Sequence, residues 1–311
     1  MPEIRCWLPE AASLHLRNLG PWHCLISSER GDETRANWCR DHLPEIPILL
    51  VRPSDSATPH RFRIKTKNRA TEEETDWSKL ANYLGEEIKQ KQGVLIDMSL
   101  LSFDTLLYLL PALRELNLSR LACIYIAPEK YTFPLQALSD QLINPIEQPK
   151  AYIALALDAD RQQARHLVFL GFDKGRAWKF IDKYDWKYDH IHVFLGDPPF
   201  VKDGREKAEN AAEPWFKLFK RNHPNHVTGI DAADPSAVAD LCASLWRECK
   251  WLDIVPLGPK PMNLGILWFY FGLTEEERGR VRLLYDFPVQ RAPRSHGIKQ
   301  IYFYDCTRML T

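Results

Sequence analysis

Short apolar runs rich in β-branched residues alternate along the chain with segments of helical period. The pattern predicts strands at residues 22–27, 46–52, 94–98, 121–127, 151–157, 167–171, 190–195, 226–230, 252–257, 281–286 and 299–304. It predicts helices at residues 76–91, 103–116, 174–183, 205–221, 235–249, 262–272 and 274–280. Such alternation is typical of βαβ units and mostly parallel sheets, so the predicted fold class is α/β. The polar stretch 53–75 reads either as a loop or, from the alternation over 61–65, as a β-ribbon.

Two parts of the chain repeat one pattern. When residues 94–131 are written over 254–291 without a gap, each gives a strand, a tight or polar loop, an apolar helix, a strand and a Tyr-x-x-Pro ending. A second correspondence joins 25–38 to 168–180, where a strand is followed by an acid, a base, a glycine and a helix. Unrelated βαβ units can share such a pattern by chance, but the ungapped length favours an internal duplication.

The duplication predicts two Rossmann-like units with mostly parallel sheets. A chain of 311 residues is long enough for two domains of ordinary size. We place the first unit at residues 1–147 and the second at 148–311, because the polar, proline-containing stretch 144–149 suits a connection.

Composition narrows the class of protein. The sequence has 41 basic and 41 acidic residues, so a whole-molecule attraction to nucleic acid or to a membrane surface is not indicated. No run approaches the ~20 apolar residues that a membrane-spanning helix needs, and the opening MPEIRCWLPE contains no signal-peptide core. The seven cysteines include no C-x-x-C pair. We therefore expect a cytoplasmic protein with reduced thiols and neither metal nor cofactor.

One loop carries the clearest sign of a ligand. The apolar run 252–257 stops at Gly258-Pro259-Lys260-Pro261, and an apolar helix follows at once. The N–H groups and the dipole at the start of a helix favour anions, and Lys260 adds a full positive charge. Gly258 lets the backbone approach a ligand closely. The loop therefore predicts an anion site, with a plain tight turn and a solvated lysine as the alternative.

The stretch DIVPLGPKPMNLGILW, residues 253–268, resembles the glycine–glycine–threonine–lysine loop of CARF (CRISPR-associated Rossmann fold) domains. That loop commonly continues with a methionine, a small residue and a leucine, and Met262 fits this continuation. Family members usually have a second glycine and a threonine before the lysine, and here those positions hold Gly258 and Pro259, so the match to the pattern is incomplete. The resemblance implies a Rossmann-like fold that binds a cyclic oligonucleotide, with Gly258, Lys260 and Met262 at the ligand.

Two fused CARF-like units would also resemble SAVED domains, which sense cyclic oligonucleotides in bacterial antiviral signalling. The resemblance implies a nucleotide-sensing or regulatory subunit of a prokaryotic defence system. The sequence shows no R-x-x-x-x-H ribonuclease signature, so the effector would be a separate protein. The sequence does not decide whether the protein forms a homo-oligomer.

Two further loops follow predicted strands. In LGFDKGRAW a strand ends at Gly171, Asp173 suits an N-cap, and Lys174 and Arg176 would flank an anion at the same sheet edge. The alternative is a capped helix with a basic first turn. Asp197, in the loop after the strand 190–195, could contact ribose hydroxyls or form an Asx turn.

Other functions remain open from the sequence. His190 and His192 face one side of a strand, but no third metal ligand is obvious by spacing. An enzyme that cleaves a phosphodiester or glycosidic bond, such as a ring nuclease, would need only positioning and charge stabilisation around Asp173 and Asp197. A scaffold with a decayed site is the third class, since Leu100 stands in the first copy where the second has Lys260.

Overall fold

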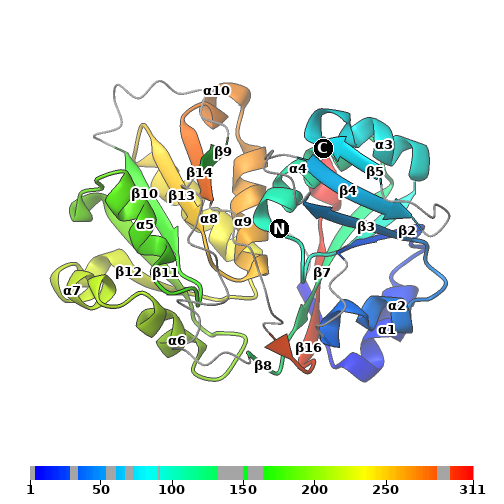
Figure 1. The fold of residues 1–311 in the computed structure, drawn as a ribbon, viewed down its shortest axis with the longest axis horizontal. Helices are drawn as coiled ribbons and strands as arrows, with labels where there is room; N and C mark the ends of the chain where they lie inside the picture. The colour runs from blue at the N-terminus through cyan, green and yellow to red at the C-terminus, as the bar shows by residue number, and fades with distance from the viewer. Residues whose placement is uncertain are drawn as a thin grey trace. The chain divides into compact units, whose positions relative to one another are not determined.

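The computed structural model describes residues 4–28, 34–53, 61–66, 73–89, 92–131, 150–152, 164–285 and 295–310. The chain forms two compact units (Figure 1). The first contains Met1–Tyr131 and Arg294–Thr311, and the second contains Thr132–Pro293. The second unit is therefore inserted into the first.

The first unit contains the strands predicted at 22–27, 46–52, 94–98, 121–127 and 299–304 and the helices predicted at 76–91 and 103–116, each within a few residues of the predicted bounds. The strand Ile4–Trp7 and the helix Pro9–Asn18 of this unit were not predicted. Its strands are β1 (Ile4–Trp7), β2 (Cys24–Ser27), β3 (Ile48–Pro53), β4 (Arg61–Thr66), β5 (Glu73–Asp76), β6 (Gly93–Asp97), β7 (Arg120–Ala127), β8 (Lys130–Tyr131), β15 (Ser295–His296) and β16 (Gln300–Asp305). Its α-helices are α1 (Pro9–Asn18), α2 (Trp38–His42), α3 (Leu80–Glu87) and α4 (Phe103–Arg114). Short 3-10 turns cover Thr34–Ala36, Trp77–Lys79 and Thr307–Leu310.

The first sheet is mixed. Its order among the described residues is β1-β16-β7-β6-β2-β3-β4-β5, and β8 pairs separately with β15. Only β7, β6, β2 and β3 are mutually parallel, whereas β4 and β5 form an antiparallel ribbon and β1 and β16 are antiparallel at the other edge. The β-ribbon interpretation of 53–75 is thus confirmed where residues are described, and the expectation of a mostly parallel sheet is wrong for this unit.

The end of the chain corrects the predicted domain limits. We expected residues 148–311 to form the second unit, but β16 lies between β1 and β7 in the first sheet. Ile301 and Phe303 are fully buried in the core that this sheet forms with α1 and α2. Strand period predicts a strand at 299–304, but it does not say which sheet the strand joins. The predicted connection at 144–149 lies outside the described residues.

The second unit is built around a parallel sheet. Its strands are β9 (Lys150–Tyr152), β10 (Arg165–Phe169), β11 (Ile191–Gly196), β12 (Val227–Ile230), β13 (Leu252–Pro256) and β14 (Val281–Tyr285). The sheet order is β12-β11-β10-β13-β14-β9, with β9 antiparallel and every other pair parallel. The helices are α5 (Arg176–Lys183), α6 (Gly204–Ala211), α7 (Trp215–Asn222), α8 (Pro235–Arg247), α9 (Lys260–Gly272) and α10 (Glu275–Arg278), with 3-10 turns at Tyr188–His190 and Pro224–His226. The helix predicted at 205–221 is two helices, because Pro214 interrupts it.

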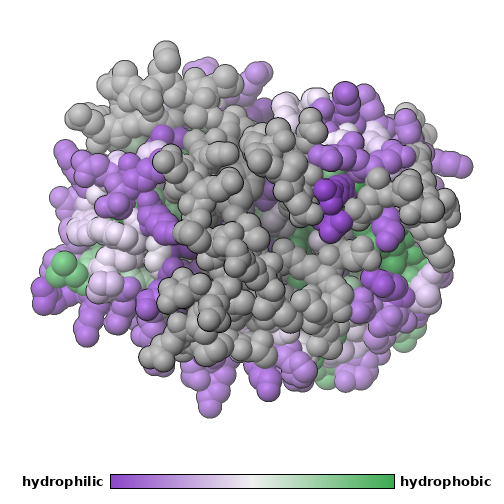
Figure 2. Space-filling model, viewed as in Figure 1, coloured by the Kyte–Doolittle hydropathy of each residue, from purple (hydrophilic) through white to green (hydrophobic). Residues whose placement is uncertain are grey.

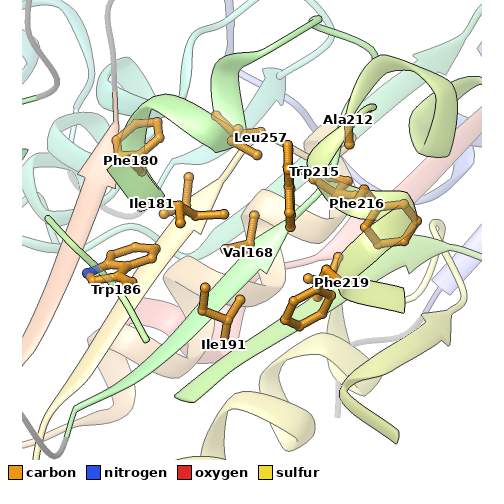
Figure 3. Close-up of a cluster of buried hydrophobic side chains, with 14 of the residues drawn as sticks. Val168, Phe180, Ile181, Trp186, Ile191, Ala212, Trp215, Phe216, Phe219 and Leu257 are labelled. Carbon is orange, nitrogen blue, oxygen red and sulfur yellow. The ribbon is translucent and has the colours of Figure 1, made fainter. Parts of the chain in front are cut away.

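Helices cover both faces of this sheet. On one face, Val168, Val193 and Val255 of neighbouring strands meet Phe180 of α5 and Phe219 of α7, as Figure 3 shows for several members of the cluster. On the opposite face, α9 packs against α8, where Gly265 has no side chain and the Pro235 carbonyl oxygen would lie 2.3 Å from an added Cβ. The described part of the unit is therefore a three-layer α/β arrangement.

A buried ionic network joins the amino ends of three strands. Asp253 of β13 is fully buried and accepts two hydrogen bonds from Arg282 of β14, each 2.9 Å long. His166 Nδ1 of β10 lies 3.0 Å from Asp253 Oδ2, the oxygen that also accepts from Arg282 Nη2. The His166 ring stacks on Trp186 at 4.2 Å, and the Arg282 guanidinium lies 4.6 Å from the centre of the Tyr184 ring. Burial would raise the pKa of Asp253, but His166 and Arg282 outweigh it and lower that pKa.

The described surface is mostly hydrophilic in the view of Figure 2. Among the described residues, few large apolar side chains are exposed, and most of them are far apart in the sequence. They are Ile4, Leu8, Leu14, Trp77, Trp178 and Leu218. No described helix is both long enough and apolar enough to cross a bilayer.

Candidate functional site

The strand order of the second sheet reverses at β10. The next strand along the chain, β11, pairs with one side of β10, whereas β13 pairs with its other side. In open parallel sheets, ligands bind outside the carboxyl ends of the strands at such a switch point. Gly171 follows β10 and Gly258 follows β13, so the structure brings together two loops predicted from the sequence. We call these two strand ends and their loops the switch-point edge.

The two loops are in direct backbone contact. The Leu257 N–H donates to the Phe169 carbonyl over 3.1 Å. A Cβ added at Gly171 would lie 2.1 Å from the Leu257 carbonyl oxygen, closer than any non-bonded contact. Only glycine fits at position 171, because any side chain there would collide with the Leu257 carbonyl.

Lys260 stands at the start of α9. Pro259 precedes it with φ −57° and ψ 156°, and the Asn263 N–H donates to the Pro259 carbonyl over 3.1 Å. The first turn of α9 carries no acidic residue and no side-chain cap, so nothing on that turn neutralises the positive end of the helix dipole. Lys260 itself is half-buried. The helix start and the lysine together favour an anion, as the sequence predicts.

Asn263 is a site residue that the sequence interpretation missed. Its side chain lies in the first helical turn, three residues after Lys260, and is only 3% exposed. Its Oδ1 atom has no hydrogen-bond partner in the described structure. Leaving such a group unpaired costs about 1–3 kcal/mol, which makes Asn263 a candidate for a polar contact that the described structure does not contain. The signal was present in the sequence as one amide within the apolar run MNLGILWFYF.

Met262 was expected at the ligand, and the structure corrects this. The residue is fully buried, and its sulfur lies 3.2 Å from the position that a Cβ on Gly258 would occupy. The Phe169 Cβ lies 3.5 Å from the same position. Met262 therefore supports the Gly258 turn from the core, because helix period turns position 262 toward the sheet.

Asp173 and Arg176 form a buried ion pair. The carboxylate and the guanidinium are in hydrogen-bond contact, and their side chains are 9% and 5% exposed. The Arg176 guanidinium also lies 5.5 Å from the centre of the Tyr285 ring at the end of β14. Arg176 was expected to offer its charge to a ligand, whereas here its charge is compensated by Asp173. The pair fixes the shape of the loop.

The start of α5 also differs from the prediction. Gly175, with φ 71°, is the N-cap in place of Asp173. The left-handed backbone favours glycine there, although the surrounding space is open. Lys174 is exposed in the turn before the helix. Of the charged residues predicted in this loop, Lys174 is thus the one with an exposed side chain.

Asp197 lies at the end of β11 and is engaged by a cation. Its carboxylate contacts Arg205 of α6, which also reaches Glu209 over 3.3 Å. Glu209 in turn accepts from Lys220 of α7 over 2.9 Å. The predicted Asp197 therefore ties α6 to the strand end, and the ribose contact stays a prediction.

The first unit has its own switch point, between β2 and β6. Asp97 at the end of β6 is 2% exposed; its Oδ1 accepts from the Ser99 N–H over 3.0 Å and its Oδ2 from the Cys39 thiol over 3.5 Å. Burial raises the pKa of Asp97 and that of the Cys39 thiol, so this thiol stays protonated at neutral pH. Leu100, which aligns with Lys260, is 9% exposed. This edge is thus occupied by internal contacts where the second unit has a lysine.

The histidines at the other end of the second sheet are packed against one another. His192 stacks on His226 at 4.7 Å, and its buried Nε2 has no hydrogen-bond partner in the described structure. Burial lowers the pKa of His192 to about 4. Within the described residues, no group of three or more His, Cys, Asp or Glu side chains could hold a metal ion. All seven cysteines are free thiols.

Comparison with known proteins does not assign the chain to a family. No protein-family model matches the chain, and no curated protein matches it.

Proposed function

We propose that the protein binds a phosphate-bearing nucleotide at the switch-point edge of its second unit. One observation carries the proposal: Lys260 and the unpaired Asn263 share the first turn of α9, at the point where the strand order reverses. The lysine and the helix start suit a phosphate, and the Asn263 oxygen suits a ribose hydroxyl or a base N–H. A nucleotide offers both groups in one molecule.

The CARF resemblance makes a cyclic oligonucleotide the first ligand to test. We infer that the protein is a sensing or regulatory subunit in antiviral defence, with its effector on a separate chain. The resemblance depends on a short motif, and the strand and helix that flank Lys260 support it. Residues 252–256 form a strand that ends at this loop, and α9 begins at the lysine.

An internal duplication is part of the proposal. The parallel strands β3-β2-β6-β7 and β11-β10-β13-β14 have the same chain order, and each set is followed by an antiparallel strand. The segments that align in the sequence, 94–131 and 254–291, are both strand-helix-strand with parallel pairing where described. The two sheets differ beyond these strands, because β12 is parallel to β11 whereas β4 is antiparallel to β3. The shared order of the four strands supports the proposed duplication.

A cleaving enzyme is a weaker candidate. The two carboxylates that the sequence places in strand-end loops, Asp173 and Asp197, each contact an arginine. A carboxylate engaged by a guanidinium has its oxygens occupied as hydrogen-bond acceptors, so it is poorly placed to take a proton from a substrate. Binding is accordingly the function that the geometry supports best.

The test is a titration of cyclic di-, tri- and tetranucleotides by calorimetry, after native mass spectrometry of the purified protein to detect a co-purifying nucleotide. Lys260→Ala should weaken the affinity of the bound nucleotide about ten- to a hundredfold, because it removes one charge-assisted contact. The matched control is Lys250→Ala, an exposed lysine before the amino end of the same strand β13. Equal affinities for the two variants would remove Lys260 from the site. Binding of none of these nucleotides by the wild type would contradict the proposed ligand class.

A further inference from the structure

An open groove runs along the outer side of α8 and α9. It has a volume of about 390 Å³ and is lined by small and aromatic residues: Ala239, Ala243, Trp246, Trp268, Phe269 and Gly272. Asp240 and Arg247 stand on its rim together with Glu277 of α10. The groove lies within the second unit and is separate from the switch-point edge.

The floor of the groove is held rigidly. Trp246 is 9% exposed, and the Arg280 guanidinium lies 5.1 Å from the centre of its ring. Glu277 is fixed by the capping box of α10, where its carboxylate accepts from the Thr274 N–H over 2.8 Å. A preformed surface of this kind lowers the ordering cost of binding a partner.

One stripe of α8 faces solvent beside this groove. Its members stand at helix spacing i, i+3, i+4 and i+7: Asp240, Ala243, Ser244 and Arg247. The two charged residues are exposed, and the described structure gives neither of them an ion-pair partner. The two central residues are small, and the Ser244 hydroxyl already donates to the Leu241 carbonyl over 2.8 Å. The stripe therefore has small side chains in its middle and opposite charges at its two ends.

This pattern is complementary to itself. Asp240 and Arg247 are seven residues apart, about 10.5 Å along a helix axis, and their midpoint falls between Ala243 and Ser244. A two-fold axis through that midpoint would place Asp240 of each copy beside Arg247 of the other copy. The small residues would then lie where the two helices cross. Closed two-fold dimers need just such a self-complementary patch.

We propose that the protein forms a two-fold dimer in which α8 packs antiparallel against α8 of a second copy. The small residues allow the helix backbones to approach closely, and the groove beside them leaves room for side chains of the second helix. The two symmetric ion pairs set the antiparallel direction, because a parallel pairing would place like charges together. The proposal does not depend on the nucleotide ligand.

Charge reversal tests the pairing directly. Asp240→Arg and Arg247→Asp should each raise the dimer dissociation constant at least about tenfold, because each homodimer gains two like-charge contacts. An equimolar mixture of the two variants should form a heterodimer in which both pairs are restored. Sedimentation equilibrium gives the dissociation constants, and native mass spectrometry separates the heterodimer from the homodimers by mass. Glu248→Arg, at an exposed position next to the stripe, is the matched control and should dimerise as the wild type does.

The double variant, Asp240→Arg with Arg247→Asp in one chain, restores both pairs within a homodimer. It keeps the test decisive if a single variant fails to fold, because it should dimerise with wild-type affinity. A wild type that stays monomeric throughout the accessible concentration range would overturn the proposal. A dimer that the single reversals do not weaken, or a mixture without a heterodimer preference, would overturn it as well.

Discussion

Replacing Asp253 with alanine should cost the second unit about 3–5 kcal/mol of unfolding free energy, because it leaves a buried guanidinium without its counter-ion. The magnitude follows from the geometry. The carboxylate is fully buried, accepts both Arg282 bonds at 2.9 Å and contacts His166 at 3.0 Å, so three bonds to one charge are lost together. Arg282 is only 7% exposed and has little water to replace them.

The assay is urea denaturation followed by tryptophan fluorescence, since Trp186 stacks on His166 within the network. Asp253→Ala is compared with Arg282→Met and with the double variant. Removing both charges should recover much of the lost stability, with a coupling energy of about 1–3 kcal/mol. The reasoning is refuted if Asp253→Ala costs less than ~1 kcal/mol, or if the double variant loses the sum of the two single variants.

Three further outcomes are expected. Gly171→Ala should destabilise the second unit by about 1–3 kcal/mol or more in denaturant, since its Cβ would lie 2.1 Å from the Leu257 carbonyl oxygen; unchanged stability would contradict that contact. Asn263→Leu should raise the melting temperature, because it removes an unpaired buried oxygen, while weakening nucleotide affinity in calorimetry; a loss of both stability and affinity would make Asn263 structural. The pKa of His192 is lowered from 6.5 to about 4, so its neutral form stabilises the fold fully above pH 6.5 and that contribution is lost as pH falls toward 4. About 1–2 kcal/mol should disappear over this window after allowance for partial exposure, and His192→Gln should flatten the pH profile measured by denaturation midpoints.

Many strands and helices could be predicted because they depend on the local spacing of apolar residues. Strands such as 252–256 and helices such as 235–247 were expected within two residues of their bounds, since apolar alternation and capping residues mark them in the sequence. Asp234, which accepts from the Ser236 and Ala237 N–H groups, caps α8 in the way that its position before Pro235 indicates.

Non-local partners were not predictable in the same way. The sheet that β16 joins and the pairing of Asp173 with Arg176 both depend on tertiary packing. Two of the predicted loops do lie at neighbouring strand ends, yet the sequence could not tell a charge facing solvent from one buried against a neighbour. Lys174 is exposed as expected, whereas Arg176 is buried against Asp173 and Met262 lies in the core.

The position of β16 also sets an order of events during synthesis. Both β1 and β7 pair with this strand, which covers Gln300–Asp305 and leaves the ribosome after every other described strand. Strands β10 to β14 and their helices lie earlier, between residues 164 and 285, so the second unit can close first. Until β16 arrives, the nascent first unit presents two open strand edges, to which other chains can add. A chain cut before residue 295 would keep those edges permanently, so the final strand acts as the closing step that protects the first unit from aggregation.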